Sequence, residues 1–206
     1  MATSRVLVLG DALRLSFQDR LARLVSEDGL EVVGPAASCG DAQRLAEGAE
    51  GWATQFTPDL AAFGCGPWAA ETLASAIAAG AAWSDRIDPL SLPAFEQSLM
   101  ETVRALTRAC GRQVVYWTTP PVHEARVSAA TGDRDAGHRI NAWIAQYNQL
   151  ATSLMGELNV AVADLHHDAA RHDDDALGPD GVSLTEAGIE MAARIVATGL
   201  YGVIHP

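Results

Sequence analysis

The chain has 206 residues, of which 49% are hydrophobic and 19% charged, and its formal net charge is −12. This length suits one domain, residues 1–206, with enough chain for a well-packed core. Every basic residue is an arginine. The acidic, lysine-free composition excludes nucleic acid and anionic membranes as expected partners, together with Schiff-base and P-loop lysine chemistry.

The three cysteines, Cys39, Cys65 and Cys110, form an odd and widely spaced set without a C-x-x-C pair. They predict no disulfide framework. The N-terminus carries one arginine and then enters an apolar run, without the longer apolar region of a secretory signal. No run approaches the length of a membrane span, so we expect a cytoplasmic protein, and we predict no cofactor.

The predicted elements alternate between strand and helix. A short apolar run, 5–9, stops at Gly10-Asp11 and passes directly into a helical pattern, which is typical of a buried parallel strand. Strands are predicted at 5–9, 30–34, 60–63, 114–118 and 160–163. Helices are predicted at 12–28, 42–50, 69–82, 93–110, 138–155 and 185–200, with loops at 83–89, 123–137 and 173–175. The alternation predicts an α/β fold with a parallel sheet and helices on both faces.

Four short motifs lie at the ends of predicted strands or just before the last helix. They are Gly10-Asp11-Ala12-Leu13, Ser38-Cys39-Gly40-Asp41, Phe63-Gly64-Cys65-Gly66 and Asp180-Gly181-Val182-Ser183-Leu184-Thr185. Open α/β sheets place their ligand sites at the carboxyl ends of their strands. The motifs therefore predict one site, and Asp41 is also a plausible N-cap for the helix that follows it.

In order and position, these motifs resemble the sequence blocks of the SGNH hydrolases, also called the GDSL lipase/esterase family. The resemblance extends from one end of the chain to the other. It implies a three-layer α/β/α fold with a five-stranded parallel sheet and a flavodoxin-like topology. It also implies that Gly40 donates an oxyanion-hole amide and that Asp180 stands at the triad carboxylate.

Three positions of the family pattern hold other residues here. The serine nucleophile aligns with Ala12, the oxyanion asparagine with Gly64 and the general-base histidine with Ser183. A methyl group cannot attack an acyl carbon, and a serine cannot replace an imidazole as a base near neutral pH. We therefore expect no ordinary ester hydrolysis.

The first functional hypothesis is a non-hydrolytic protein, a pseudoenzyme. Its cleft would bind a small acyl- or carbohydrate-bearing ligand or a protein partner. Trp68 could supply a flat wall for such a ligand, or could simply pack in the core. The candidate ligand-binding residues are Asp11, Ala12, Gly40, Gly64, Cys65, Trp68, Asp180 and Ser183.

The second hypothesis is an enzyme that runs altered chemistry in the same pocket, in a specialised biosynthetic pathway. Cys65 could transfer an acyl group, although no histidine near it in sequence is fixed to activate the thiol. Elimination, cyclisation or isomerisation could instead use Asp11, His123 and Asp180. Each candidate also has a structural interpretation, since aspartates cap helices and turns, small cysteines are often buried, and loop histidines are often solvated.

A histidine- and aspartate-rich stretch precedes the last motif. His166, His167 and His172 lie near Asp168 and the acidic run 173–175, a composition found in metal sites. Their spacing matches no closed zinc pattern. We predict a flexible acidic surface loop and no metal.

Overall fold

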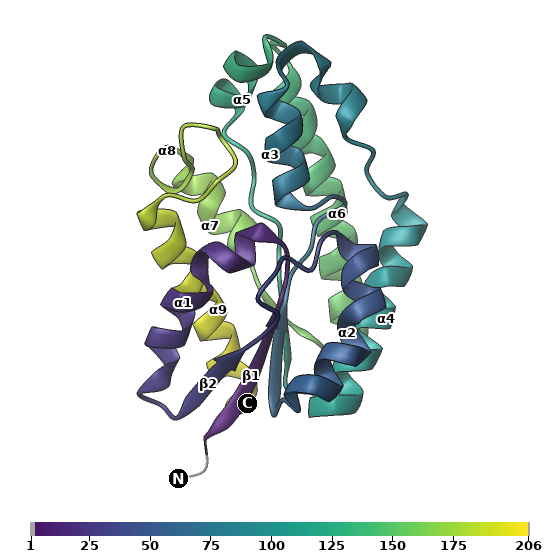
Figure 1. The fold of residues 1–206 in the computed structure, drawn as a ribbon, viewed down its shortest axis with the longest axis vertical. Coiled ribbons are helices and arrows are strands. Elements are labelled where there is room, and N and C mark those ends of the chain that lie inside the picture. The colour runs from purple at the N-terminus through teal and green to yellow at the C-terminus, as the bar shows by residue number, and fades with distance from the viewer. Residues whose placement is uncertain (1–2, 206) are drawn as a thin grey trace.

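The protein is described by a computed structural model covering residues 3–205, and it is built around a five-stranded parallel sheet (Figure 1). The strand order is β2-β1-β3-β4-β5, and every neighbouring pair runs parallel. The strands are β1 (Ser4–Leu9), β2 (Leu30–Val33), β3 (Leu60–Phe63), β4 (Val114–Trp117) and β5 (Ala161–Ala163). The predicted parallel sheet and its five strands are confirmed.

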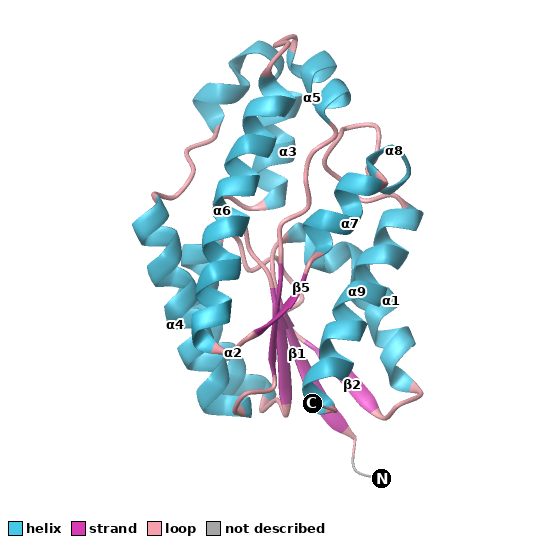
Figure 2. Cartoon of the chain, turned by 180° about the vertical axis from the view of Figure 1, so that it is seen from behind, coloured by secondary structure: helices cyan, strands magenta, loops and turns pink. Residues whose placement is uncertain are grey.

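Helices cover both faces of the sheet, as Figure 2 shows from behind. The helical elements are α1 (Ala12–Ser26), α2 (Ala42–Phe56), α3 (Ala70–Ala78), the 3₁₀ helix η1 (Gly80–Arg86), α4 (Leu92–Cys110), α5 (Glu124–Thr131), α6 (Ala136–Leu158), α7 (Leu165–Arg171), α8 (Asp173–Ala176) and α9 (Glu186–Ile204). One core packs α2, α4 and α6 on one face, and a second packs α1 and α9 on the other. The predicted three-layer α/β/α fold is confirmed.

The alternation of side chains along β1 explains why this apolar strand lies at the centre. Leu7 and Leu9 enter the core beneath α2 and α4, whereas Val6 and Val8 enter the core beneath α1 and α9. Successive residues of a strand point to opposite faces, so a strand covered on both sides must be apolar at every position. These four residues are fully buried.

A third apolar cluster stands above the carboxyl ends of the strands. It joins α3, η1, α5 and the first half of α6, which rise beyond the sheet in Figure 1. Trp68, Leu73, Trp83 and Ile144 are among its buried members. The predicted site lies between this cluster and the carboxyl ends of the strands.

Several predicted elements differ from the structure. The predicted loop 123–137 contains the helix α5, which begins after the N-cap residue His123 and ends at Gly132, whose φ of 69° is left-handed. The predicted helix 69–82 and the predicted loop 83–89 are instead the shorter α3 followed by η1. The predicted helix 42–50 continues to Phe56.

The histidine- and aspartate-rich stretch is also more ordered than predicted. It forms the short helices α7 and α8 rather than a flexible loop. Asp164 caps α7 by accepting a hydrogen bond from the backbone of His167 at 3.1 Å. Local capping therefore gives helical structure to a sequence with few apolar residues.

The last helix differs from the expectation that no run approaches a membrane span. By length and composition alone, α9 (Glu186–Ile204) is apolar enough to cross a membrane. In the fold it packs against α1 and against the sheet, with Ala193, Val196 and Leu200 buried. The helix is the central cover of one sheet face.

Asp11 joins the sheet edge to two helices. Its carboxylate accepts a hydrogen bond from Leu13 N at 3.0 Å, which caps α1, and one from Ala70 N at 2.7 Å, at the start of α3. The side chain is buried, with 8% of the residue exposed. Burial raises the pKa of Asp11 to about 6, with a further increase from the Glu71 carboxylate, and outweighs the lowering by the two amide hydrogen bonds.

This pKa predicts a stability change with pH. The folded-state pKa of about 6 lies above the unperturbed value of 3.8, so the contribution of Asp11 is present below pH 4 and is lost as the pH rises through 6. The loss in the free energy of unfolding is on the order of 3 kcal/mol. Urea denaturation of the wild type and of Asp11→Asn, measured from about pH 4 to 7, should show the wild type losing stability relative to the variant as pH rises.

Asp19→Asn, on the exposed side of the same helix, is the matched control. A difference between wild type and Asp11→Asn that stays constant over this pH range would contradict the prediction.

Candidate functional site

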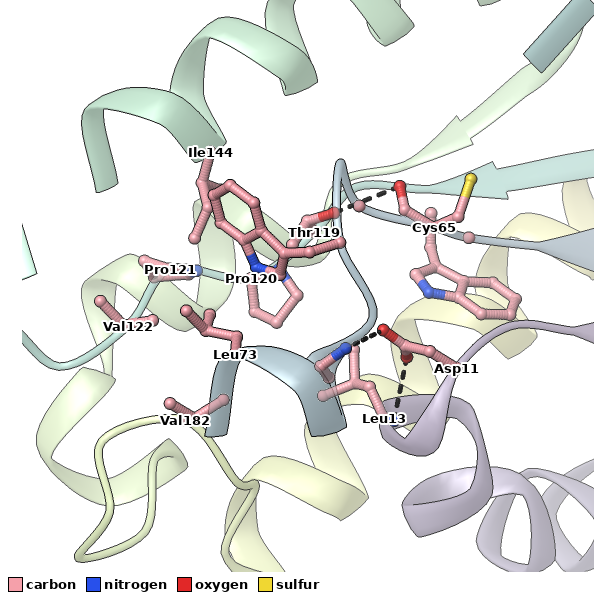
Figure 3. Close-up of a pocket in the computed structure, with 15 residues that line it drawn as sticks. Asp11, Leu13, Cys65, Leu73, Thr119, Pro120, Pro121, Val122, Ile144 and Val182 are labelled. Carbon is pink, nitrogen blue, oxygen red and sulfur yellow. Dashed lines mark hydrogen bonds between the residues drawn. The ribbon is translucent and has the colours of Figure 1, made fainter. Parts of the chain in front are cut away.

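Two adjoining hollows lie at the carboxyl edge of the sheet, and three of the four motifs contribute residues to their walls. We call the first the groove; its lining includes Ala12, Ser16, Glu71, Ala74, Ser183 and Leu184. We call the second the cavity (Figure 3); its lining includes Asp11, Gly64, Cys65, Trp68, Leu73, Trp117, Thr119, Pro120, Pro121, Val122 and Ile144. Leu13, Ala70 and Val182 line both hollows and separate them.

Ala12 and Ser183, which the resemblance aligns with the serine and the histidine of the family pattern, both line the groove. Ala12 begins α1, and Ser183 lies in the turn before α9. The Ser183 hydroxyl donates to Asp180 Oδ2 at 2.5 Å, and Asp180 Oδ1 accepts from the amides of Val182 and Ser183 at 3.0 and 2.9 Å. Ser183 therefore contacts the carboxylate that the resemblance assigned to a triad.

Partial burial raises the pKa of Asp180, but the hydrogen bonds from the Ser183 hydroxyl and the two backbone amides outweigh this effect. The pKa of the carboxyl therefore lies below its usual value. Asp180 is held ionised in a local turn, which is a structural role and a poor basis for a general acid.

Glu71, in the first turn of α3, is a site residue that the sequence analysis missed. Its carboxylate accepts a hydrogen bond from Ala12 N at 3.1 Å and one from the Ser38 hydroxyl at 2.5 Å. The same hydroxyl oxygen accepts from Gly40 N at 3.0 Å. The Gly40 amide, which the resemblance places in an oxyanion hole, and the Ala12 amide are thus both bonded to side chains of this chain.

Nothing near Ala12 or Ser38 in the sequence indicates this contact. Glu71 is 59 positions from Ala12 and 33 from Ser38. A carboxylate in the first turn of a helix is favourable for the helix alone, so its presence there signals no site.

The resemblance aligns Gly64 with the oxyanion asparagine, and the side chain of Trp117 from the neighbouring strand fills the space beside it. A Cβ atom at Gly64 would lie 2.0 Å from Nε1 of Trp117, the last residue of β4. Trp117 is 2% exposed and packs edge-on against Phe17, with ring centroids 5.4 Å apart. Its indole lies where a side chain at position 64 would begin, so an asparagine there is incompatible with this tryptophan.

Cys65 lines the cavity, but its thiol belongs to the core on the face of the sheet that α2, α4 and α6 cover. Figure 3 shows its sulfur directed away from Asp11 and Thr119. Burial raises the pKa of this thiol far above its usual value, so the reactive thiolate is strongly disfavoured. Cys39, Cys65 and Cys110 are all unpaired.

His123 has a structural role outside the lining of the cavity. Its Nδ1 accepts from Arg126 N at 3.4 Å, capping α5, and its Nε2 lies 2.9 Å from Asp174 Oδ1. Its neighbour Val122 faces the cavity instead. Of the four candidate catalytic residues, the structure places Asp11 and Cys65 on the cavity wall and His123 and Asp180 elsewhere.

Two asparagines of α6 fix the remaining wall of the cavity by hydrogen bonds to its backbone. Asn148 accepts from Thr119 N at 3.0 Å and donates to Thr119 O at 2.8 Å. Asn141 makes the equivalent pair with Val122, at 2.8 and 3.0 Å. Because these paired bonds fix the backbone of 119–122, the wall is preorganised.

Trp68 is buried at the edge of the cavity. It lines the cavity and also packs edge-on against Trp143 at 5.9 Å between ring centroids. Within residues 3–205, no group of three or more histidine, cysteine, aspartate or glutamate side chains is arranged to hold a metal ion.

No protein-family model matches the chain, and no curated protein matches it. Solved structures do. A catalytic mutant of an acetylxylan esterase from Geobacillus stearothermophilus is 16% identical over 97% of this chain and 95% of its own, with a TM-score of 0.73. A lipase/acylhydrolase from Enterococcus faecalis is 14% identical over 97% of this chain and 96% of its own, with a TM-score of 0.71.

A GDSL-like lipase from Bacteroides thetaiotaomicron is 13% identical over 97% of this chain and 88% of its own, with a TM-score of 0.67. At these identities the likeness concerns the fold. The chain has the three-layer α/β/α fold of the GDSL-type, or SGNH, hydrolases, as the resemblance of its motifs implied.

Proposed function

We propose that this chain binds a small, acyl-bearing compound in the groove, which adjoins the much smaller cavity, and does not hydrolyse it. The observation that carries the proposal is the pair of hydrogen bonds from Ala12 N and the Ser38 hydroxyl to Glu71. An esterase of this fold needs the amide at position 12 free for the oxyanion that forms during attack. Here that amide already has a carboxylate acceptor.

The chemistry of the groove supports the same conclusion. Ester hydrolysis by a triad requires a nucleophilic oxygen, an imidazole to take its proton and donors for the oxyanion. The groove presents the methyl group of Ala12 and the hydroxyl of Ser183 at the first two positions. Losing one oxyanion donor alone costs about 10²–10³ in rate where it has been tested.

The walls of the groove favour an acyl group over a sugar. They consist mainly of Ala, Leu and Val side chains, and the polar atoms of Ser16, Glu71 and Ser183 are already hydrogen bonded. A carbohydrate needs several free polar partners when it is buried. The structural neighbours named as acylhydrolase and acetylxylan esterase add support for an acyl compound.

A protein partner is a weaker candidate for the same surface. Among residues 3–205, the exposed large hydrophobic side chains are Leu15 on α1 and Leu158 on α6. Isolated apolar residues of this kind are ordinary on protein surfaces, and protein interfaces are marked by larger patches. The groove is therefore the better candidate site.

One observation favours a second candidate function, acid–base catalysis by Asp11. Its carboxyl lines the cavity and has a pKa of about 6, near the range useful for proton transfer. Against this, both carboxylate oxygens accept backbone hydrogen bonds, and His123 and Asp180 lie outside the cavity lining. A reaction abolished by Asp11→Asn in a folded protein would establish this function instead.

We predict that Ala12→Ser gives no esterase activity. The new hydroxyl would lie beside Ser183, which cannot take its proton, and the amide at position 12 would stay bonded to Glu71. Hydrolysis of p-nitrophenyl acetate by Ala12→Ser should equal that of the wild type. The double variant Ala12→Ser/Glu71→Ala should also be inactive, because the base is still missing, and turnover by either variant above wild type would contradict the proposal.

The binding itself is tested with methyl butanoate, a small neutral ester. We predict saturable binding by ligand-observed NMR, with the ester recovered intact and no butanoate or methanol formed. Val182→Phe places a larger side chain in the groove and should abolish binding, whereas Leu15→Phe on the exposed side of α1 should not. Absence of binding to the folded wild type, or release of butanoate, would refute the proposed function.

A further inference from the structure

We propose that the groove selects acyl compounds that also carry a positive charge, such as an ester of an amino alcohol, and that the carboxylate of Glu71 recognises this charge. The inference rests on the proposed function and deepens it, since it adds a cationic group to the acyl compound. Glu71 is thereby a specificity-determining residue of the groove.

The groove has room for such a compound and one ionisable side chain in its wall. Its volume is about 330 Å³. This lies within the range of small-molecule sites, roughly 300–1,000 Å³. Among the described residues that line it, Glu71 carries the only charge, and the others are Ala, Leu, Val and Ser. A short acyl compound therefore has apolar walls to contact beside a single carboxylate.

The carboxylate of Glu71 is held in place without being neutralised. One oxygen accepts from Ala12 N at 3.1 Å and the other from the Ser38 hydroxyl at 2.5 Å. Both donors are uncharged, and within residues 3–205 no arginine or histidine forms an ion pair with Glu71. Each carboxylate oxygen can accept more than one partner, so a cation can still approach from the groove. A side chain already fixed by two bonds loses little freedom when that cation binds.

The neighbouring acidic groups make the groove more favourable for a cation. The Asp11 carboxyl is close enough to Glu71 for the Glu71 charge to raise the pKa of Asp11. Asp180 accepts from the hydroxyl of Ser183, which lines the groove. Like charges repel at this range, so a carboxylate ligand is disfavoured here and an ammonium group is attracted.

The buried cation of this region, Arg14, offers Glu71 no partner. Its side chain is fully buried, and its guanidinium donates to the carbonyl oxygens of Pro35 at 2.8 Å and Ala37 at 2.6 Å. Arg14 also lies outside the lining of the groove. The positive charge that would complement Glu71 must therefore come from the ligand.

Two esters that differ in one atom isolate the contribution of this charge. Acetylcholine carries a quaternary ammonium group, and 3,3-dimethylbutyl acetate has a carbon atom in place of that nitrogen. Using ligand-observed NMR, we expect the wild type to bind acetylcholine on the order of 5-fold more tightly at low salt, since an exposed ion pair contributes modestly. The preference should disappear at about 1 M salt, where charges are screened within roughly 3 Å.

Glu71→Gln is the matched variant, because it removes the charge and keeps the shape of the side chain. We expect its affinities for the two esters to become equal. Glu96→Gln on the exposed side of α4 is the control, because it changes the net charge equally outside the groove and should keep the preference. If Glu71→Gln does not fold, the salt series on the wild type decides.

The outcomes separate this inference from the proposed function. If the wild type binds both esters equally at low salt, binds the neutral ester more tightly, or keeps its preference at high salt or in Glu71→Gln, the recognition of charge is wrong and the proposed function stands. If the folded wild type binds neither ester and no methyl butanoate, or if it releases choline, the proposed function fails and this inference fails with it.

Discussion

One buried carboxylate determines how the edge of the sheet meets the helices above it. Asp11 caps α1 through Leu13 N and binds the start of α3 through Ala70 N. Since Glu71 is the next residue of α3, the same contact brings its carboxylate to the amide of Ala12. The burial that this arrangement requires raises the pKa of Asp11 to about 6. The hydrogen bond from the Ala12 amide to Glu71 is therefore a direct consequence of how Asp11 holds the start of α3.

The same region contains a second, compensating arrangement. Gly64 has no side chain, and Trp117 of the neighbouring strand occupies the space that one would need. The two residues fit only as a pair, because a Cβ at position 64 would overlap the indole. Glycine at this position therefore leaves no hole, because the indole of Trp117 fills the space. In this chain the groove has the amide of Ala12 already hydrogen bonded to Glu71, and an apolar cavity lies beside it.

Much of the fold could be predicted because the signals are local. The apolar runs of β1 and β3 end at glycines, and Asp41 was predicted as an N-cap and accepts from Arg44 N at 3.0 Å. Helix α5 was missed because Val127 and Thr131 are its buried residues, too few to produce a periodic pattern. A histidine N-cap and a left-handed Gly132 define that helix instead.

The contents of the site could be predicted only in part. The motifs identified the groove, since Ala12 and Ser183 do line one hollow. The contacts of Glu71 with Ala12 and of Trp117 with Gly64 join residues more than fifty positions apart, and nothing in the composition of either segment signals them. His123 was a candidate for acid–base catalysis, but its ring caps α5 and lies against Asp174.

The most direct test of the whole account is a crystal structure of the protein grown with methyl butanoate. The account predicts an intact ester in the groove, with Glu71 still bonded to the amide of Ala12. An ester whose carbonyl oxygen sits on that amide with Glu71 displaced, or butanoate in place of the ester, would contradict it.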